Sequence, residues 1–166
     1  VALPAHVGAT RAVGTARAEK ASDDVSRVWN RMFAAGRVTE QYRALFADDV
    51  TFIMTASDGA AREQRGVEAA VATAQAWIDA GAAAYKTEFV AGTSSGNTVM
   101  GVVVSAATFK TPTGDVCVAT GQQAFRLVYD GNDKIATYEY LWDQLVLDEQ
   151  MKQCAAARGD AAKAEL

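Results

Sequence analysis

The residues best suited to chemistry lie in the last predicted strand, residues 134–147, which reads KIATYEYLWDQLVL. Side chains alternate across a strand, so Glu139 and Asp143 should share one face. A carboxylate in mid-strand is unfavourable when buried alone, because a charge then loses its hydration. Asp143 therefore either meets solvent and a partner, or lines a cavity in which its ionisation is used.

Glu139 allows two interpretations. Two carboxylates on one cavity wall would repel each other and raise the pKa of one, an arrangement suited to acid-base catalysis. In the simpler interpretation, Glu139 pairs with Arg126 on the neighbouring strand. If the cavity does hold a reaction, Tyr42 and Tyr85 are candidate hydrogen-bond donors to an oxyanion.

A second group of residues could line an apolar pocket for a ring-shaped ligand. They are mostly aromatic and fall at helix or strand spacing: Trp29, Phe33, Tyr42, Met54, Trp77 and Phe125. Such stripes form a plain hydrophobic core more often than a ligand wall, and both alternatives are open.

Tyr138, Tyr140 and Trp142 occupy the opposite face of the last strand from Asp143. If Asp143 faces a cavity, these three rings must lie on the outer face of the sheet, where no other predicted element covers them. Adjacent exposed aromatic side chains are typical of a protein interface. We therefore expect a contact surface there.

The predicted elements form one α+β domain over residues 22–150. Helices are expected from Ser22 to Gly36, from near Thr39, and over 67–80, with a strand over 50–55 between the last two. Four long antiparallel strands follow over 85–91, 98–110, 115–129 and 134–147. Residues 1–21 are expected to form an irregular arm and residues 151–166 a helical or frayed tail.

Three stretches carry a family resemblance: Leu45–Val50 (LFADDV), Arg65–Ala69 (RGVEA), and the run from Asp130-Gly131 to Asp143. In this order the chain resembles the NTF2-like superfamily, and within it the SnoaL-like, polyketide cyclase-like domains. The resemblance implies a cone of three N-terminal helices packed on a strongly curved, mainly antiparallel sheet. It also implies that Asp143 is the acid/base and that the sheet face dimerises. Pocket histidines are common in the family, whereas the only histidine here is His6.

Composition excludes several classes of function. The formal net charge of -4 argues against a nucleic-acid partner, and no apolar run is long enough to span a membrane. Cys117 and Cys154 are far apart without metal-ligand spacing, so we expect neither a metal nor another cofactor. A free thiol at Cys117, acting as a small hydrophobe in a strand, is favoured, and a single disulfide is the alternative. The start of the chain carries Arg11 and Arg17 but no acid, which fits either a transit-peptide remnant of an organellar protein or a flexible leader of a cytoplasmic one.

Two functions are therefore open. One is a cofactor-independent isomerase, cyclase or dehydratase that binds a small apolar molecule and uses Asp143 as acid/base. The other is a non-catalytic scaffold, acting as a homodimer or as an accessory subunit of a larger assembly.

Overall fold

The computed structural model describes residues 5–55, 60–110, 116–142, 149–150, 152–154 and 156. The labelled helices are α1 (Ala5–Ala35), α2 (Glu40–Ala44) and α3 (Val67–Asp79), and residues 149–150, 152–154 and 156 are also helical. The strands are β1 (Phe46–Thr55), β2 (Ala61–Arg65), β3 (Ala82–Ser95), β4 (Thr98–Lys110), β5 (Val116–Tyr129) and β6 (Ile135–Trp142).

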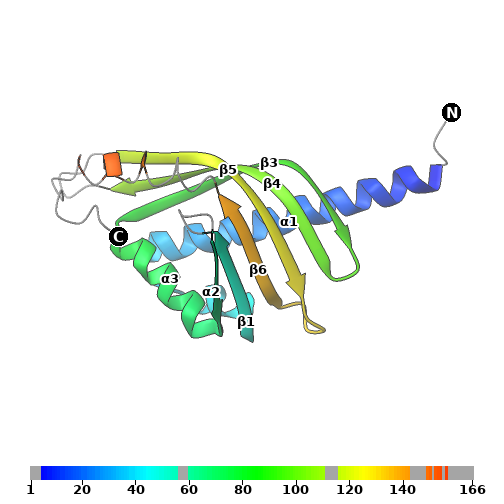
Figure 1. Ribbon diagram of the computed structural model, residues 1–166, viewed down its shortest axis with the longest axis horizontal. Coiled ribbons are helices and arrows are strands. Elements are labelled where there is room, and N and C mark those ends of the chain that lie inside the picture. Colours follow the sequence, from blue (N-terminus) through cyan, green and yellow to red (C-terminus); the bar gives the residue numbers. More distant parts are fainter. Residues whose placement is uncertain are drawn as a thin grey trace.

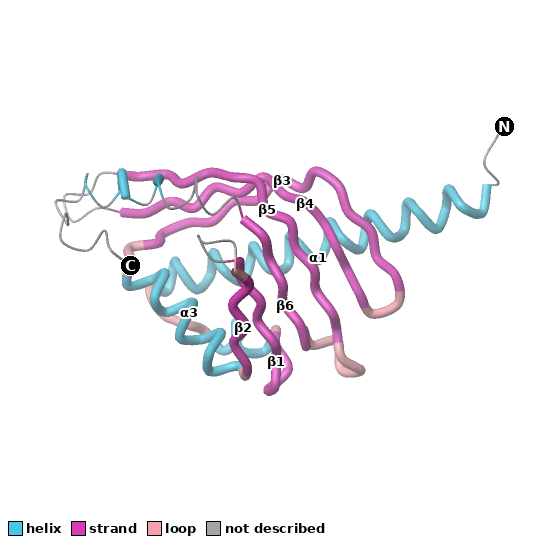
Figure 2. The backbone as a smooth tube through the Cα atoms, in the orientation of Figure 1, coloured by secondary structure: helices cyan, strands magenta, loops and turns pink. Residues whose placement is uncertain are grey.

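The described strands form one six-stranded sheet in the order β2-β1-β6-β5-β4-β3. Adjacent strands are antiparallel, except that β1 and β6 run parallel. The sheet is strongly curved and open, and the helices lie on one side of it, which we call the inner face (Figure 1, Figure 2). The predicted α+β architecture of helices on a curved, mainly antiparallel sheet is confirmed.

Several local predictions are also confirmed. The Thr39 hydroxyl caps α2 by accepting a hydrogen bond from the backbone N–H of Tyr42 at 3.3 Å. Helix α3 ends one residue before the predicted Ala80, and Gly81 follows with φ 88°. In the turn before β6, Asp130 Oδ1 accepts from the backbone N–H groups of Asn132 and Lys134 at 2.8 and 2.9 Å.

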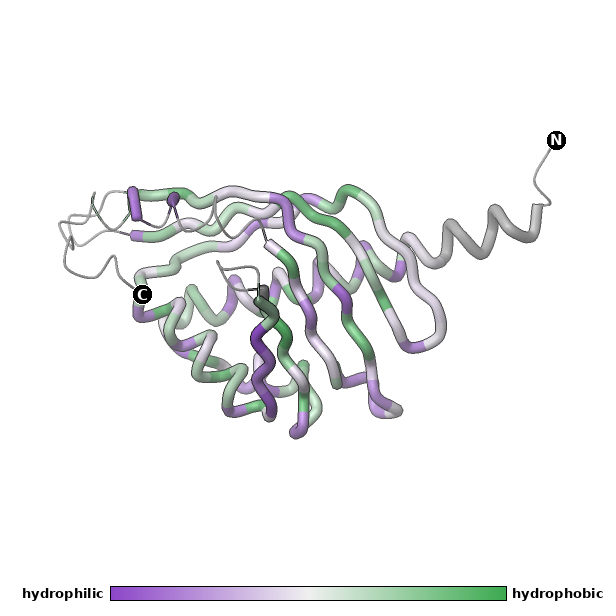
Figure 3. The backbone as a smooth tube through the Cα atoms, in the orientation of Figure 1, coloured by the Kyte–Doolittle hydropathy of each residue, from purple (hydrophilic) through white to green (hydrophobic). Residues whose placement is uncertain are grey.

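Strand β2 was not predicted. Its sequence, AREQR, has no apolar alternation, and Figure 3 shows it as a hydrophilic strand. It forms a strand because it pairs with β1 at the edge of the sheet, from Thr51 opposite Arg65 to Thr55 opposite Ala61.

The prediction of an irregular arm over residues 1–21 is wrong for residues 5–21, which belong to α1. This stretch is rich in alanine, the best helix former, and its two glycines each cost only about 1 kcal/mol in a helix. The helix packs closely on β3 from Gly14 onward: a Cβ at Gly14 would lie 3.2 Å from the backbone N of Ser94. Ser22, the predicted start of the first helix, is therefore buried in the middle of α1.

Helix α1 and strand β3 are in close contact where they cross at Gly92. Ala18 is fully buried, and a Cβ at Gly92 would lie 2.8 Å from the Ala18 Cβ. The Thr15 hydroxyl donates to the Gly92 carbonyl at 3.2 Å. Small residues on both elements thus allow the helix to approach the strand backbone.

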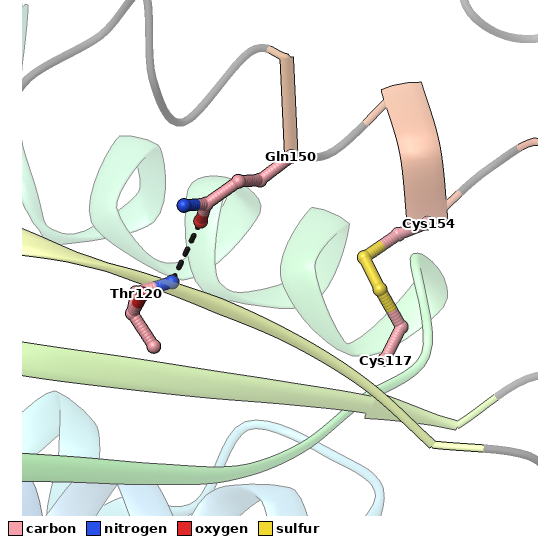
Figure 4. The surroundings of a disulfide bond; sticks show 4 residues. All are labelled: Cys117, Thr120, Gln150 and Cys154. Carbon is pink, nitrogen blue, oxygen red and sulfur yellow. Dashed lines mark hydrogen bonds between the residues drawn. A yellow bond between two sulfur atoms is a disulfide. The ribbon is translucent and has the colours of Figure 1, made fainter.

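The prediction of a free thiol at Cys117 is wrong, because Cys117 and Cys154 form a disulfide with a Cα–Cα distance of 5.6 Å (Figure 4). The described pairing of β6 with β5 begins at Gln123, and nearer the start of β5 the Gln150 Oε1 accepts from the backbone N–H of Thr120 at 2.7 Å (Figure 4). The disulfide and this hydrogen bond attach the C-terminal segment to β5. The 37-residue separation of the cysteines gave no sign of the pairing.

Within the described part of the chain, no helix combines the length and apolar character needed to cross a membrane.

Candidate functional site

A pocket lies between the helices and the inner face of the sheet; we call it the aromatic pocket. The helices contribute Trp29, Phe33, Thr73 and Trp77. The sheet contributes Phe52, Tyr85, Gln123, Tyr138, Tyr140 and Trp142. The pocket has a cavity volume of about 40 Å³, and about 10–15 Å³ is enough to hold one water molecule.

Helical and strand periodicity bring these rings together. Trp29 and Phe33 are four residues apart on α1, so they share a face, and the rings of Trp29 and Trp77 lie 6.3 Å apart. Trp77 in turn stacks on Trp142 of β6 with 6.3 Å between ring centroids. The three tryptophans thus connect α1, α3 and β6 around the pocket.

Tyr85 is held in place at both its backbone and its hydroxyl. The Asn30 side chain accepts from the Tyr85 backbone N–H at 2.9 Å and donates to its carbonyl. The Tyr85 hydroxyl donates to Gln123 Oε1 at 2.7 Å. Because Asn30 lies on α1 and Gln123 on β5, Tyr85 is positioned from two sides of the pocket.

A smaller cavity, of about 20 Å³ on the same measure, adjoins the aromatic pocket. Tyr85, Gln123 and Tyr138 line both spaces, and Ser22 and Thr87 add polar groups to the smaller one. Ser22 and Gln123, which border these cavities, are two of the buried polar side chains in the described chain.

The pocket tyrosines are neutral over the physiological pH range. Burial raises the pKa of Tyr85 to about 12, although a hydrogen bond with Ser105 opposes the shift. Burial also raises the pKa of Tyr138 and of Tyr140, and neighbouring tyrosines add to both shifts. These hydroxyls can therefore donate hydrogen bonds but cannot serve as bases at neutral pH.

Trp142 differs from the other pocket residues. The residue is 8% exposed, and its Nε1 is a buried donor without a hydrogen-bond partner among the described residues. A Cβ at Gly121 of β5 would collide with this nitrogen. Glycine at position 121 thus lets the indole lie flat across the neighbouring strand.

The opposite face of the sheet carries a second, wider depression of about 430 Å³; we call it the outer groove. Met100, Val102, Ala124 and Leu141 contribute to it, together with Arg126 and Glu139. Arg126 Nε lies 2.6 Å from Glu139 Oε2, and the two side chains are 40% and 31% exposed.

Solved structures with the same arrangement exist. An NTF2-like protein from Anabaena variabilis is 17% identical, with a TM-score of 0.57 over 74% of this chain and 87% of that one. A protein described as a SnoaL-like polyketide cyclase, from Shewanella denitrificans, is 11% identical, with a TM-score of 0.60 over 79% and 96%. An LEH-like epoxide hydrolase from M. tuberculosis is 12% identical, with a TM-score of 0.59 over 86% and 96%.

The chain has the NTF2-like fold. No family model and no curated protein sequence matches it. At these identities the similarity establishes the fold and leaves the activity open.

In this NTF2-like fold, the predicted ligand-binding residues divide into two groups. Trp29, Phe33 and Trp77 line the aromatic pocket, and Phe125 lines the smaller cavity. Tyr42 is fully buried and donates its hydroxyl to the Ala70 carbonyl at 3.2 Å, while Met54 packs against the core. Neither Tyr42 nor Met54 lines either inner cavity.

The predicted orientation of β6 is wrong. Tyr138, Tyr140 and Trp142 line the aromatic pocket on the inner face, so they form no surface on the outer face. The prediction that these rings lie on the outer face depends on the assumption that Asp143 faces a cavity. Burying three large aromatic side chains against the helices stabilises the opposite orientation.

Asp143 lies outside the described residues, and its role as acid/base stays a prediction. Glu139 lies in the outer groove and is absent from the described lining of both inner cavities. Its predicted ion pair with Arg126 is confirmed.

Sequence reasoning missed Phe52, Thr73 and Gln123 as pocket residues. For Gln123 a signal was present: it shares a strand face with Ala119, Phe125 and Leu127, all buried and apolar. A polar residue in such a position needs a partner, which here is the Tyr85 hydroxyl.

Proposed function

We propose that the protein binds a small apolar ligand in the aromatic pocket. The observation that carries this proposal is the lining: eight of the ten residues around the pocket are aromatic, and none of these ten is charged. Ligand sites are typically apolar cavities with a few well-placed polar groups, and Tyr85 and Gln123 provide such groups here.

Toluene is a suitable probe because it is a single apolar ring. The aromatic walls must move apart to admit it, since the pocket volume of about 40 Å³ is smaller than the roughly 150 Å³ of a cavity that binds benzene. Thr73→Phe should fill the pocket from α3 and weaken toluene binding at least tenfold, measured by tryptophan fluorescence or calorimetry. Thr73→Val is the matched control, since it keeps the side-chain size and should change affinity less than threefold. Equal binding by the wild type and Thr73→Phe would place toluene elsewhere and contradict the proposal.

Catalysis is proposed as a further property of the same pocket, with Asp143 as the acid/base. The described strand β6 ends at Trp142, so strand alternation does not assign Asp143 to the outer face on which Glu139 lies. The described pocket tyrosines are neutral at pH 7, so a proton acceptor must come from another residue, and Asp143 follows Trp142 directly in the chain. Two of the structural neighbours are described as a SnoaL-like polyketide cyclase and an isomerase.

The test uses exchange of the protons next to the carbonyl of cyclohexanone in D₂O, followed by NMR. The wild type should accelerate this exchange and Asp143→Asn should not, while circular dichroism shows the same fold for both. Exchange by Asp143→Asn at the wild-type rate would remove Asp143 from the mechanism.

A second candidate function is assembly with another copy of this chain through the outer face. The exposed large apolar side chains of the described chain lie on strands β3 to β6: Val90, Met100, Val104, Val116, Val118 and Leu141. The outer groove also places Arg126 beside Glu139, so a two-fold mate could present its own glutamate to this arginine.

Analytical ultracentrifugation of the wild type and of Met100→Glu distinguishes a dimer from a monomer. We expect a wild-type dimer at micromolar concentration and a Met100→Glu monomer, because a charge would then be buried without a partner. Glu149→Gln, an exposed position on the C-terminal segment, is the control and should remain dimeric. A monomeric wild type would exclude this assembly.

A further inference from the structure

Strand β5 has one edge that a neighbouring strand covers only in part. On its first side β5 pairs with β4 from Val116 to Val128. On its second side the described pairing with β6 begins at Gln123, so residues 116–122 have no strand beside them in the described chain. An edge of this kind presents backbone N–H and C=O groups that can pair with another strand.

The C-terminal segment covers this edge at two points. The Thr120 N–H donates to Gln150 Oε1 at 2.7 Å, and Cys117 is bonded to Cys154 (Figure 4). Because N–H groups point alternately to the two sides of an antiparallel strand, the Val118 N–H points away from β4 in the same way as that of Thr120. The Gln150 side chain thus takes the place of an acceptor on a neighbouring strand.

The sequence of this edge is suited to strand pairing. Residues 116–122 read VCVATGQ, with no charge and no proline, and Val116 and Val118 are 61% and 49% exposed. Strand β2, at one end of the sheet, carries Arg62, Glu63 and Arg65, and α1 packs on β3 at the other end. Charges and covering elements are the usual protection of strand edges. On β5 the disulfide-bonded C-terminal segment supplies this protection.

We propose that reduction of the Cys117–Cys154 disulfide uncovers the edge of β5 over residues 116–122, which then pairs with the same edge of a second copy of this chain. Two identical strands can pair antiparallel about a two-fold axis, so that N–H groups of one copy meet C=O groups of the other. The two edges are uncharged and do not repel each other. The sheets join edge to edge, in contrast to assembly through the outer face, and the pairing is independent of ligand binding in the aromatic pocket.

Reduction requires an external reductant, and a dithiol supplies the right balance. Its thiolate attacks the sulfur of Cys117, which is half-buried, whereas Cys154 is 1% exposed. The Cys154 sulfur leaves and takes up a proton, and the second thiol of the reductant displaces Cys117. The protein gains two electrons and two protons, and the dithiol becomes a disulfide. The Thr120–Gln150 hydrogen bond remains, but such a bond stabilises by only about 0.5–1.5 kcal/mol.

The experiment uses the full chain with Met100→Glu, which blocks assembly through the outer face and leaves the β5 edge unchanged. Analytical ultracentrifugation measures its self-association when oxidised and after reduction with a phosphine. We expect the association constant to rise at least about tenfold on reduction. Cys117→Ala/Cys154→Ala, combined with Met100→Glu, should dimerise without a reductant. Equal association in the two redox states would overturn the proposal.

Val118→Pro, added to Met100→Glu, tests whether the β5 edge is the contact in the reduced protein. Proline removes the Val118 N–H, which points away from β4, so the hydrogen bonds between β4 and β5 are kept. Dimerisation should be lost. Val118→Thr is the matched control, because it keeps the branched shape and the N–H and should dimerise like the parent. Circular dichroism checks the fold of both variants, and a dimer of folded Val118→Pro would overturn the edge as the contact.

Hydrogen exchange gives a readout without any substitution at the edge. In the reduced Met100→Glu protein, the backbone amides of Val118 and Gln122 should exchange more slowly as the protein concentration rises, because pairing between copies protects them. Exchange at these amides that does not depend on concentration would likewise overturn the proposal.

Discussion

Tyr85 connects several parts of the site. Its backbone is paired with Asn30 of α1, its hydroxyl donates to Gln123 of β5, and its ring borders both inner cavities. The ring also lies 6.2 Å from that of Trp29. A buried phenol held in this way stays protonated at high pH, because ionisation would place a charge in an apolar site.

This property predicts a loss of stability in alkali. The pKa of Tyr85 is about 12 in the folded protein against 10.0 for an unperturbed tyrosine, so the folded state holds its proton more tightly. Its contribution to stability is therefore complete below pH 10 and is lost as the pH rises toward 12. The loss should be roughly 2–3 kcal/mol for this residue.

Urea unfolding at pH 8, 10 and 11.5 measures this loss, with Tyr85→Phe as the reference. The free energy of unfolding of the wild type should fall more steeply above pH 10 than that of Tyr85→Phe. Parallel pH profiles for the two proteins would show that Tyr85 does not titrate in the expected range.

At the scale of elements, the seating of α1 on β3 determines the helix side of the pocket. Ala18 meets Gly92 closely, and further along the same helix Asn30 and Trp29 reach the pocket. A displacement of α1 from β3 would therefore also displace the walls of the site.

We predict that Gly92→Ala destabilises the protein by about 1–3 kcal/mol. The added Cβ would lie 2.6 Å from the Met100 carbonyl oxygen and 2.8 Å from the Ala18 Cβ, so strand or helix must shift. Gly131→Ala is the control, because nothing lies within 4 Å of a Cβ there, and it should change stability by less than about 0.5 kcal/mol. Equal urea midpoints for the two variants would contradict the close seating of α1.

At the scale of the whole molecule, the Cys117–Cys154 disulfide ties the C-terminal segment to the sheet (Figure 4). A cross-link over a 37-residue separation restricts the unfolded chain, and the chain-entropy estimate for such a loop is about 4 kcal/mol. Disulfides of this kind persist in oxidising surroundings.

Reduction should therefore lower the free energy of unfolding by about 2–4 kcal/mol, measured by urea unfolding with and without a phosphine reductant. Cys117→Ala/Cys154→Ala should unfold at the reduced wild-type midpoint and should not respond to the reductant. A wild type whose midpoint is unaffected by complete reduction would show that the cross-link contributes little to stability.

Much of the NTF2-like fold followed from local patterns in the sequence. The start of α2 near Thr39, helix α3 and strands β4 and β5 each depend on residues close together in the chain, and each is present. The aromatic residues on α1 and α3 could be named as candidate pocket walls for the same reason. Helical and strand periods are properties of a few consecutive residues.

Tertiary structure alone decided the rest. Which side chains of β6 point inward depends on its register with the neighbouring strands, and a shift of one residue exchanges the two faces. Ile135 and Tyr138 are both buried, although simple alternation places them on opposite faces. The extension of α1 depends on packing against β3, and the disulfide depends on two distant segments meeting. These features arise from contacts between residues far apart in the chain, which no local pattern specifies.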